Sequence, residues 1–194
     1  AGQLGMKTAV VERDEIGGVC LNWGCIPSKA LLRNADVLGL FQRAGEFGIS
    51  VDNIQYDFGK AIDRSREVVG KLTRGIGFLL KKNKVEHVKG VGVLKDRNTV
   101  AIEDTDRTLS TTNVIIATGA RFRELPALPI DGQVVITSRE ALELREVPGE
   151  VVIVGGGATG VEFAYLYRKY GSDVTIVELL PHLVPLEDEE ISQH

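Results

Sequence analysis

Residues 151–160 read VVIVGGGATG, and this stretch decides the fold that we predict for the chain. Four apolar residues are typical of a short buried strand, and the glycines that follow interrupt it sharply. A helical segment continues to about Lys169, and a second apolar run ends at the acidic residue Glu178. Strand, glycine loop, helix and strand in this order predict a parallel βαβ unit and therefore an α/β fold.

Gly155, Gly157 and Gly160 occupy the glycine positions of the G-x-G-x-x-G dinucleotide fingerprint. They permit a tight turn, let the backbone approach a pyrophosphate, and allow the helix to pack closely on the strand. The helix N-terminus then receives the phosphate charge. Glu178 follows the first glycine at close to the ~20 residues expected for an acid that binds a ribose hydroxyl. This acid would repel a 2′-phosphate, which favours NAD over NADP. A glycine-rich turn without a ligand is the alternative.

Residues 4–12, LGMKTAVVE, repeat the pattern of residues 170–178, YGSDVTIVE. Each copy has a glycine where a helix ends, a short apolar strand and a final glutamate. The repeat predicts an earlier dinucleotide unit in which Glu12 corresponds to Glu178. Its first strand and glycine loop would precede Ala1, so we expect ~15 to 20 residues to be absent at the N-terminus. A natural start without a first fingerprint is the alternative.

Periodicity elsewhere predicts two long helices. The first runs from about Pro27 to Arg43, with an apolar stripe formed by Ala30, Leu31, Ala35, Leu38 and Phe41. The second runs from Phe58 to Lys82, and its inward-facing residues are expected to be Ile62, Val69, Leu72, Ile76 and Leu79.

Further strands are predicted between these helices and the fingerprint, and one before them. Their expected ranges are Lys7–Val11, Val85–Leu94, Thr99–Glu103 and Asn113–Ile116. Prolines and a glycine then interrupt regular secondary structure in the segment that leads into the fingerprint. We therefore place a domain boundary near Pro148, with one domain at 1–148 and the start of a second at 149–194.

Residues 17–29 read GGVCLNWGCIPSK and contain both cysteines of the chain. A structural crosslink would stabilise little here, because the chain-entropy estimate for a loop of about six residues is only ~2 kcal/mol. Pro27 suits the first turn of a helix whose positive end would face Cys25, and Lys29 adds a further positive charge. Both features favour a thiolate. We interpret the pair as a disulfide that opens and closes; two free cysteines or half of a metal site are the alternatives.

The whole run resembles the redox-active disulfide segment of the flavoprotein disulfide reductases. Residues 20–29, CLNWGCIPSK, are most similar to the dihydrolipoamide dehydrogenase group of that family. The resemblance implies Rossmann-like three-layer domains that bind FAD and NAD, the first without its initial strand and glycine loop, the second only begun. It also implies a relay in which dihydrolipoamide reduces the disulfide, the dithiol reduces FAD, and the reduced flavin passes hydride to NAD+. Cys20 would be the interchange thiol and Cys25 the charge-transfer thiol near the flavin.

The same resemblance assigns roles to residues outside the cysteine pair. Lys29 and Glu162 match a family pair that meets near the reactive nitrogen of the flavin; ordinary surface charge is the alternative for each. Glu12 would hold the adenosine ribose of FAD. The remaining positions, expected to lie beside FAD, are Gly17, Gly18, Gly92, Thr118 and Gly119.

The family's catalytic His–Glu pair lies in a C-terminal dimerisation domain, and no such motif occurs in these 194 residues. We therefore expect the chain to be inactive alone and the full-length protein to be a homodimer. The resemblance implies that its partner is dihydrolipoamide carried on the lipoyl domain of a 2-oxoacid dehydrogenase or glycine cleavage complex. A reducing cytoplasm is the expected compartment, because a disulfide there is more often catalytic than structural.

Composition excludes some functions and leaves others open. A net charge of -4 gives no electrostatic case for nucleic-acid binding. No apolar run approaches the length of a membrane span. Within the resembled family, a mercuric or glutathione reductase is the rival; Glu178 and Gly160 fit a glutathione reductase less well. A flavin- or nucleotide-binding redox module without dithiol catalysis, or a structural remnant, would belong to another class of protein.

Overall fold

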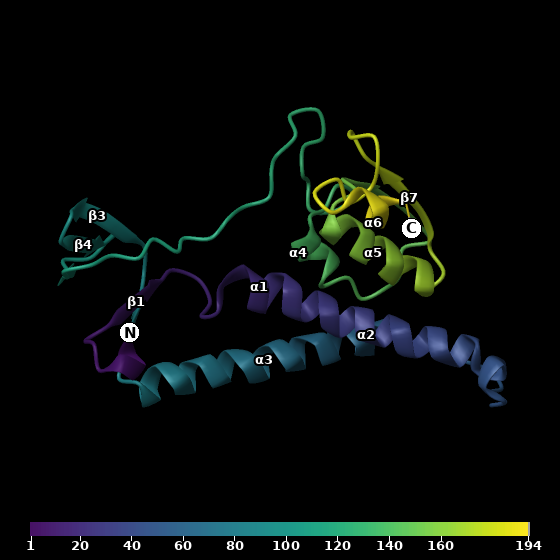
Figure 1. The fold of residues 1–194 in the computed structure, drawn as a ribbon, viewed down its shortest axis with the longest axis horizontal. Helices are drawn as coiled ribbons and strands as arrows, with labels where there is room; N and C mark the ends of the chain where they lie inside the picture. Colours follow the sequence, from purple (N-terminus) through teal and green to yellow (C-terminus); the bar gives the residue numbers. More distant parts are fainter. Residues whose placement is uncertain (194) are drawn as a thin grey trace. The chain divides into compact units, whose positions relative to one another are not determined.

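The computed structural model describes residues 1–193, and the chain divides into two compact units (Figure 1). One unit comprises residues 1–22 and 69–123; the other comprises residues 23–68 and the residues from 124 onward. His194, the last residue of the second predicted domain, lies outside the described residues. These two units do not test the predicted domain boundary near Pro148, which stays a prediction.

The first unit contains two small sheets. β1 (Ala9–Glu12) and β2 (Glu86–Lys89) pair in parallel, so that Glu12 lies opposite Lys89. The other sheet is antiparallel, in the order β3 (Gly92–Asp96), β4 (Thr99–Ile102) and β5 (Thr108–Ser110). The unit also contains a 3₁₀ turn, η1 (Gly2–Leu4), most of α1 (Gly18–Trp23) and the second part of α3 (Phe58–Lys82).

The second unit contains the predicted βαβ arrangement. β6 (Glu150–Val154) and β7 (Asp173–Val177) are parallel, with Glu150 opposite Asp173 and Val154 opposite Val177. α5 (Ala158–Lys169) connects them and packs against both strands (Figure 1). The βαβ unit predicted from residues 151–178 is therefore confirmed.

Helices cover α5 on its other side. α2 (Cys25–Gln42) packs against α5, and the first part of α3 joins the same core. A capping box at Thr137 and Glu140 starts the short α4 (Ser138–Ala141). The buried core of this unit consists of Leu31, Ala35, Leu38, Phe58, Ala61, Ile62, Ala141, Leu142, Phe163, Leu166, Tyr167 and Tyr170. The remaining short elements are η2 (Ala44–Phe47) and α6 (Glu189–Ser192).

The helices differ from the prediction at their ends. α2 begins at Cys25 rather than near Pro27, and a separate short helix, α1, lies before it. Pro27 is tolerated at the third position because the first hydrogen bond of the helix is donated by the next residue, from Ser28 N to Gly24 O at 3.1 Å. The predicted bounds of α3 are confirmed.

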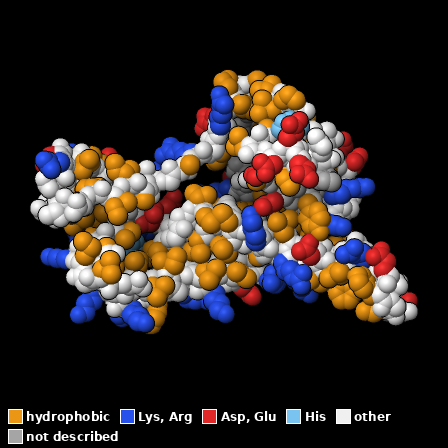
Figure 2. Space-filling model, in the orientation of Figure 1, with side chains coloured by type: hydrophobic (Ala, Val, Ile, Leu, Met, Phe, Trp, Pro, Cys, Tyr) orange, Lys and Arg blue, Asp and Glu red, His pale blue; other side chains and the backbone are white. Residues whose placement is uncertain are grey.

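Part of each apolar stripe is exposed, contrary to prediction. Phe41 on α2 is 51% exposed, and Leu72 and Leu79 on α3 are 40% and 50% exposed. The buried positions end at Gly39 along α2 and at Val69 along α3. Hydrophobic side chains consequently reach the surface over the later part of α3 (Figure 2).

Two strand predictions were wrong in detail. The range Val85–Leu94 is broken by Gly90, which has a φ of 143° and separates β2 from β3. Residues 113–116 form no strand in the described part of the chain, and Ile115 and Ile116 are 87% and 75% exposed. An apolar run needs neighbouring strands to bury both of its faces, and here it pairs with none among residues 1–193. Within these residues, no helix is both long and apolar enough to cross a bilayer.

Candidate redox and dinucleotide sites

Cys20 and Cys25 form a disulfide, since each is disulfide-bonded and the chain contains no other cysteine. Cys20 lies within α1, and Cys25 is the first residue of α2. Both residues are exposed. Because Cys25 lies in the first turn of an 18-residue helix, it is close to the positive end of the helix dipole, which favours a thiolate.

The Gly17–Gly18 turn before α1 is fixed by a buried asparagine. Asn22 is 3% exposed, and its amide nitrogen donates to Ile16 O at 3.1 Å and to Gly18 O at 2.9 Å. The hydroxyl of Thr73 donates to the Asn22 side-chain oxygen at 3.2 Å. Gly17 has a φ of 103°, and a Cβ there would lie 2.3 Å from a methyl of Leu21. The turn therefore requires glycine and presents a rigid backbone next to Cys20.

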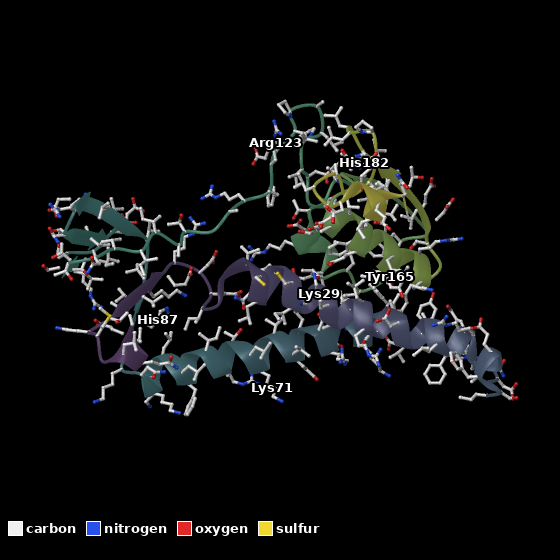
Figure 3. The ribbon with its side chains drawn as sticks, viewed as in Figure 1. Lys29, Lys71, His87, Arg123, Tyr165 and His182 are labelled. Atoms are coloured by element: carbon white, nitrogen blue, oxygen red, sulfur yellow. The ribbon has the colours of Figure 1, made fainter. Side chains whose placement is uncertain are left out.

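Lys29 and Glu162 meet as predicted. Lys29, which Figure 3 labels on α2, donates through Nζ to Glu162 Oε1, on α5, at 2.7 Å. The Lys29 side chain is 58% exposed and that of Glu162 25% exposed. The pair joins the helix that begins at Cys25 to the helix whose N-cap is the fingerprint residue Gly157.

Gly155 and Gly157 lie in the tight loop between β6 and α5, and Gly160 lies in the first turn of α5. Gly155 has a φ of 108°, which a residue with a side chain rarely adopts. A Cβ at Gly160 would lie 1.9 Å from Gly155 O, so the helix can approach the strand only with glycine at that position. Gly157 is the N-cap of α5, and a Cβ there would meet no atom within 4 Å. Open space beside this N-cap leaves room for a phosphate.

Glu178 lies at the end of β7, against the same loop. Its carboxylate accepts hydrogen bonds from Leu180 N at 2.8 Å and from Gly156 N at 2.6 Å. These backbone donors, with Leu180 first, lower the pKa of Glu178 below its ordinary value. The acid is therefore held ionised next to the glycine loop, at the edge of the sheet where nucleotides bind in α/β folds.

In the other unit, Glu12 and Gly90 lie at the carboxyl ends of the parallel strands β1 and β2. Gly90 N donates to the backbone oxygen of Glu12 at 3.0 Å, and the Glu12 carboxylate accepts from Asp14 N at 2.8 Å. Gly92 starts β3, where a Cβ would lie 3.3 Å from a methyl of Val11. Gly92 therefore lies next to the strand that ends at Glu12, and the roles of both residues beside FAD stay predictions.

Thr118 and Gly119 are exposed and lie in a segment without regular secondary structure. Gly119 has a φ of 76°. Among the described residues, neither hydrogen-bonds to another predicted site residue. Their role beside FAD stays a prediction.

Sequence reasoning missed the residues that hold the segment between the cysteines. Asn22 stands inside the quoted run, and its polarity within a helix was the available signal. Trp23 has the guanidinium carbons of Arg139 and Arg66 at 4.2 Å and 4.8 Å from its ring centroid. No sequence pattern could have found that contact, because Arg66 and Arg139 come from separate helices.

Comparison with known proteins agrees with this geometry. The family model described as pyridine nucleotide-disulphide oxidoreductase matches residues 1–194. Dihydrolipoyl dehydrogenase of Chlorobaculum parvum is 48% identical over 196 residues, which cover 100% of this chain and 42% of that protein. Dihydrolipoyl dehydrogenase of Mycobacterium leprae is 47% identical over 200 residues, again with 100% and 42% covered. The chain therefore spans less than half the length of these relatives.

Solved structures give the same result. LpdA from Mycobacterium tuberculosis matches with a TM-score of 0.86 and 26% identity, over 96% of this chain and 42% of that one. The HOCl-induced flavoprotein disulfide reductase RclA from Escherichia coli matches with a TM-score of 0.82 and 29% identity, over 99% and 41%. These likenesses confirm the predicted α/β Rossmann-like fold and the resemblance drawn from the cysteine run. The chain belongs to the pyridine nucleotide-disulphide oxidoreductase family.

Proposed function

We propose that the protein containing this chain is a dihydrolipoamide dehydrogenase, which carries two electrons from dihydrolipoamide through the Cys20–Cys25 disulfide and FAD to NAD+. The observation that carries the proposal is the disulfide itself, with Cys25 at the start of α2. Its sequence neighbourhood, CLNWGCIPSK, and the relatives named dihydrolipoyl dehydrogenase support this substrate over glutathione or mercury.

The proposed substrate step exchanges one disulfide for another. A thiolate of dihydrolipoamide attacks the sulfur of Cys20, the Cys20–Cys25 bond breaks, and Cys25 leaves as a thiolate. The second substrate thiol, deprotonated by a general base, attacks the mixed disulfide; lipoamide closes its ring and Cys20 leaves with a proton. Two electrons have then moved from substrate to protein. The positive end of α2 stabilises the Cys25 thiolate, which makes it the better leaving group.

The residues present fit the two nucleotide cofactors. The close approach of Gly160 to Gly155 and the open N-cap at Gly157 suit a pyrophosphate, and we assign Glu178 to the ribose of NAD. Glu12 is assigned to the ribose of FAD, and the other FAD neighbours are Gly17, Gly18, Gly92, Thr118 and Gly119. When bound, a flavin couples a two-electron thiol pair to a hydride carrier.

Lys29 and Glu162 are assigned to positions beside the flavin ring. The chain's own contribution there is electrostatic, because the ion pair fixes an ammonium group near the start of α2. The Lys29 side chain, which is 58% exposed, is available to hold a polar edge of the cofactor, while Glu162 orients its ammonium group.

The remaining parts of the proposal concern the whole protein. The substrate is carried on a lipoyl domain of a 2-oxoacid dehydrogenase or glycine cleavage complex, the active form is a homodimer, and the compartment is the cytoplasm. The 194 residues alone are expected to be inactive, because the proposal requires a general base from the dimerisation domain.

The test is a full-length assay that follows oxidation of NADH or NADPH with lipoamide, glutathione disulfide or mercuric ion as the electron acceptor, each in a separate reaction. Turnover of NADH with lipoamide at least about 100-fold above either other acceptor is expected, since a difference of ~2.7 kcal/mol in transition-state binding gives that ratio. Preferred reduction of glutathione disulfide or mercuric ion would identify the rival reductases. A flavin-loaded protein that passes electrons to none of the three acceptors would identify a non-catalytic redox module.

A further inference from the structure

Trp23 is the only tryptophan of the chain and lies between the two cysteines, as the last residue of α1. Two guanidinium groups contact its ring. The Cζ of Arg139 lies 4.2 Å from the ring centroid, and the Cζ of Arg66 lies 4.8 Å from it. Both distances are well inside the ~6 Å range of cation–π attraction, and tryptophan is the ring that attracts cations most strongly.

Both arginines are held by well-packed elements of the same unit. Arg66 lies on α3 next to Ser65, which is fully buried, and four residues after Ile62, which is 2% exposed. Arg139 lies on α4, where the capping box of Thr137 and Glu140 fixes the first turn. These packed elements position both arginines beside the ring of Trp23.

Only Gly24 separates α1 from α2, and the disulfide spans this connection. While the disulfide is closed, the covalent bond limits how far the connection can move. Once it is reduced, the glycine leaves the backbone free to change conformation at low energetic cost. A side chain anchored beside Gly24 would then decide how close the two thiols stay.

We propose that Trp23 is a positioning residue for the redox pair: Arg66 and Arg139 hold its ring, and the ring keeps the two thiols within bonding reach after the disulfide opens. The inference rests on the proposed dithiol function. Loss of the anchor lowers the effective concentration of one thiol at the other, so the equilibrium shifts from disulfide toward dithiol.

The experiment measures this equilibrium directly. Full-length, flavin-loaded protein is equilibrated with mixtures of reduced and cyclic oxidised dithiothreitol, quenched with acid, alkylated with a maleimide and weighed by mass spectrometry. In this exchange the protein disulfide takes two electrons and two protons from dithiothreitol, which closes to its cyclic disulfide. The ratio of dithiol to disulfide at each mixture gives the equilibrium constant.

Trp23→Ala is expected to shift the constant toward the dithiol by about tenfold, which corresponds to a potential higher by ~30 mV. Arg139→Gln should shift it in the same direction by about threefold, since one of the two cation–π contacts remains. Trp23→Phe should shift the equilibrium constant less than Trp23→Ala does, because a smaller ring still attracts the guanidinium groups. Arg139 is exposed, so this variant is expected to fold normally.

Arg64→Gln is the matched control. Arg64 also lies on α3, but its guanidinium donates to Ala30 O at 3.2 Å and to Asn34 Oδ1 at 3.1 Å. A constant within twofold of wild type in Trp23→Ala and Arg139→Gln would overturn the proposal, and so would an equal shift in Arg64→Gln. Alkylation reads the disulfide without lipoamide, so failure of the dehydrogenase assay leaves this result interpretable on its own.

Discussion

Lys29 Nζ lies 2.7 Å from Glu162 Oε1, although the two residues are 133 positions apart in the sequence. The contact connects the helix that starts at the redox cysteine with the helix that starts at the dinucleotide loop. The chemistry proposed for the protein requires electrons to pass between these two regions. An ion pair between them is thus a candidate for function as well as for stability.

Replacing Lys29 with alanine should separate those two roles. Because more than half of the Lys29 side chain is exposed, the free energy of unfolding should change by less than ~1 kcal/mol. If the ammonium group acts beside the flavin, turnover of the full-length enzyme should fall by about tenfold or more, the effect of losing ~1.4 kcal/mol of transition-state stabilisation. The measurements are urea denaturation and steady-state kinetics.

Lys60→Ala is the control for this change. Lys60 pairs with Asp57 at 3.8 Å, and its side chain is 83% exposed. Its replacement should leave turnover unchanged. Equal turnover in wild type and Lys29→Ala would remove Lys29 from the catalytic assignment.

Gly160→Ala should destabilise the βαβ unit. The added Cβ would lie 1.9 Å from Gly155 O, a backbone atom that cannot move without shifting α5 from the strand. We expect a loss of about 1–3 kcal/mol or more in unfolding free energy and a weaker affinity for NADH. Gly157→Ala provides the comparison, because its Cβ would meet no atom within 4 Å. Equal losses of unfolding free energy in Gly160→Ala and Gly157→Ala would contradict the steric argument.

Asn22→Ala should loosen the turn at Gly17 and Gly18. The substitution removes the donors to Ile16 O and Gly18 O and the acceptor for the Thr73 hydroxyl. Leaving these part-buried polar groups without their partner should cost about 1 kcal/mol, and the affinity for FAD should fall if this turn faces its pyrophosphate. Thermal denaturation and flavin titration measure the two effects. Unaltered flavin affinity in a destabilised variant would assign Asn22 to folding alone.

The stability contributed by Glu178 should depend on pH. Hydrogen bonds from Leu180 N and Gly156 N lower the pKa of its carboxyl in the folded state. The contribution is therefore present above the unfolded pKa of ~4.3 and is lost as the pH falls through the lower folded value. The difference in Tm between wild type and Glu178→Gln should be largest at neutral pH and should shrink below about pH 4. A difference that is independent of pH would exclude the carboxylate as its source.

The sequence predicted what depends on local pattern. The βαβ unit at 150–177 was found because its apolar periodicity, glycines and final acid are contiguous, and the repeat at 4–12 extended the argument to β1. The Lys29–Glu162 pair came only from the resemblance to a family, since nothing local connects residues so far apart. The disulfide was favoured by its surroundings, but the bare spacing left free cysteines open.

Other features depend on which surfaces meet. The run at 113–116 has the composition of a strand, yet a strand exists only where a neighbour accepts its hydrogen bonds. The contact of Trp23 with Arg66 and Arg139 arises from the packing of α3 and α4, which no periodicity encodes. Leu72 and Leu79 fit the helical periodicity, but both are exposed, because periodicity alone does not decide whether a side chain is covered.

The most direct measurement follows the absorbance of full-length, flavin-loaded protein after one equivalent of dihydrolipoamide is added without oxygen. If Cys20 and Cys25 pass electrons beside the flavin, a long-wavelength band should appear in wild type and be missing in Cys25→Ser. A band that persists in Cys25→Ser, or a wild-type protein that takes up no flavin, would contradict the account.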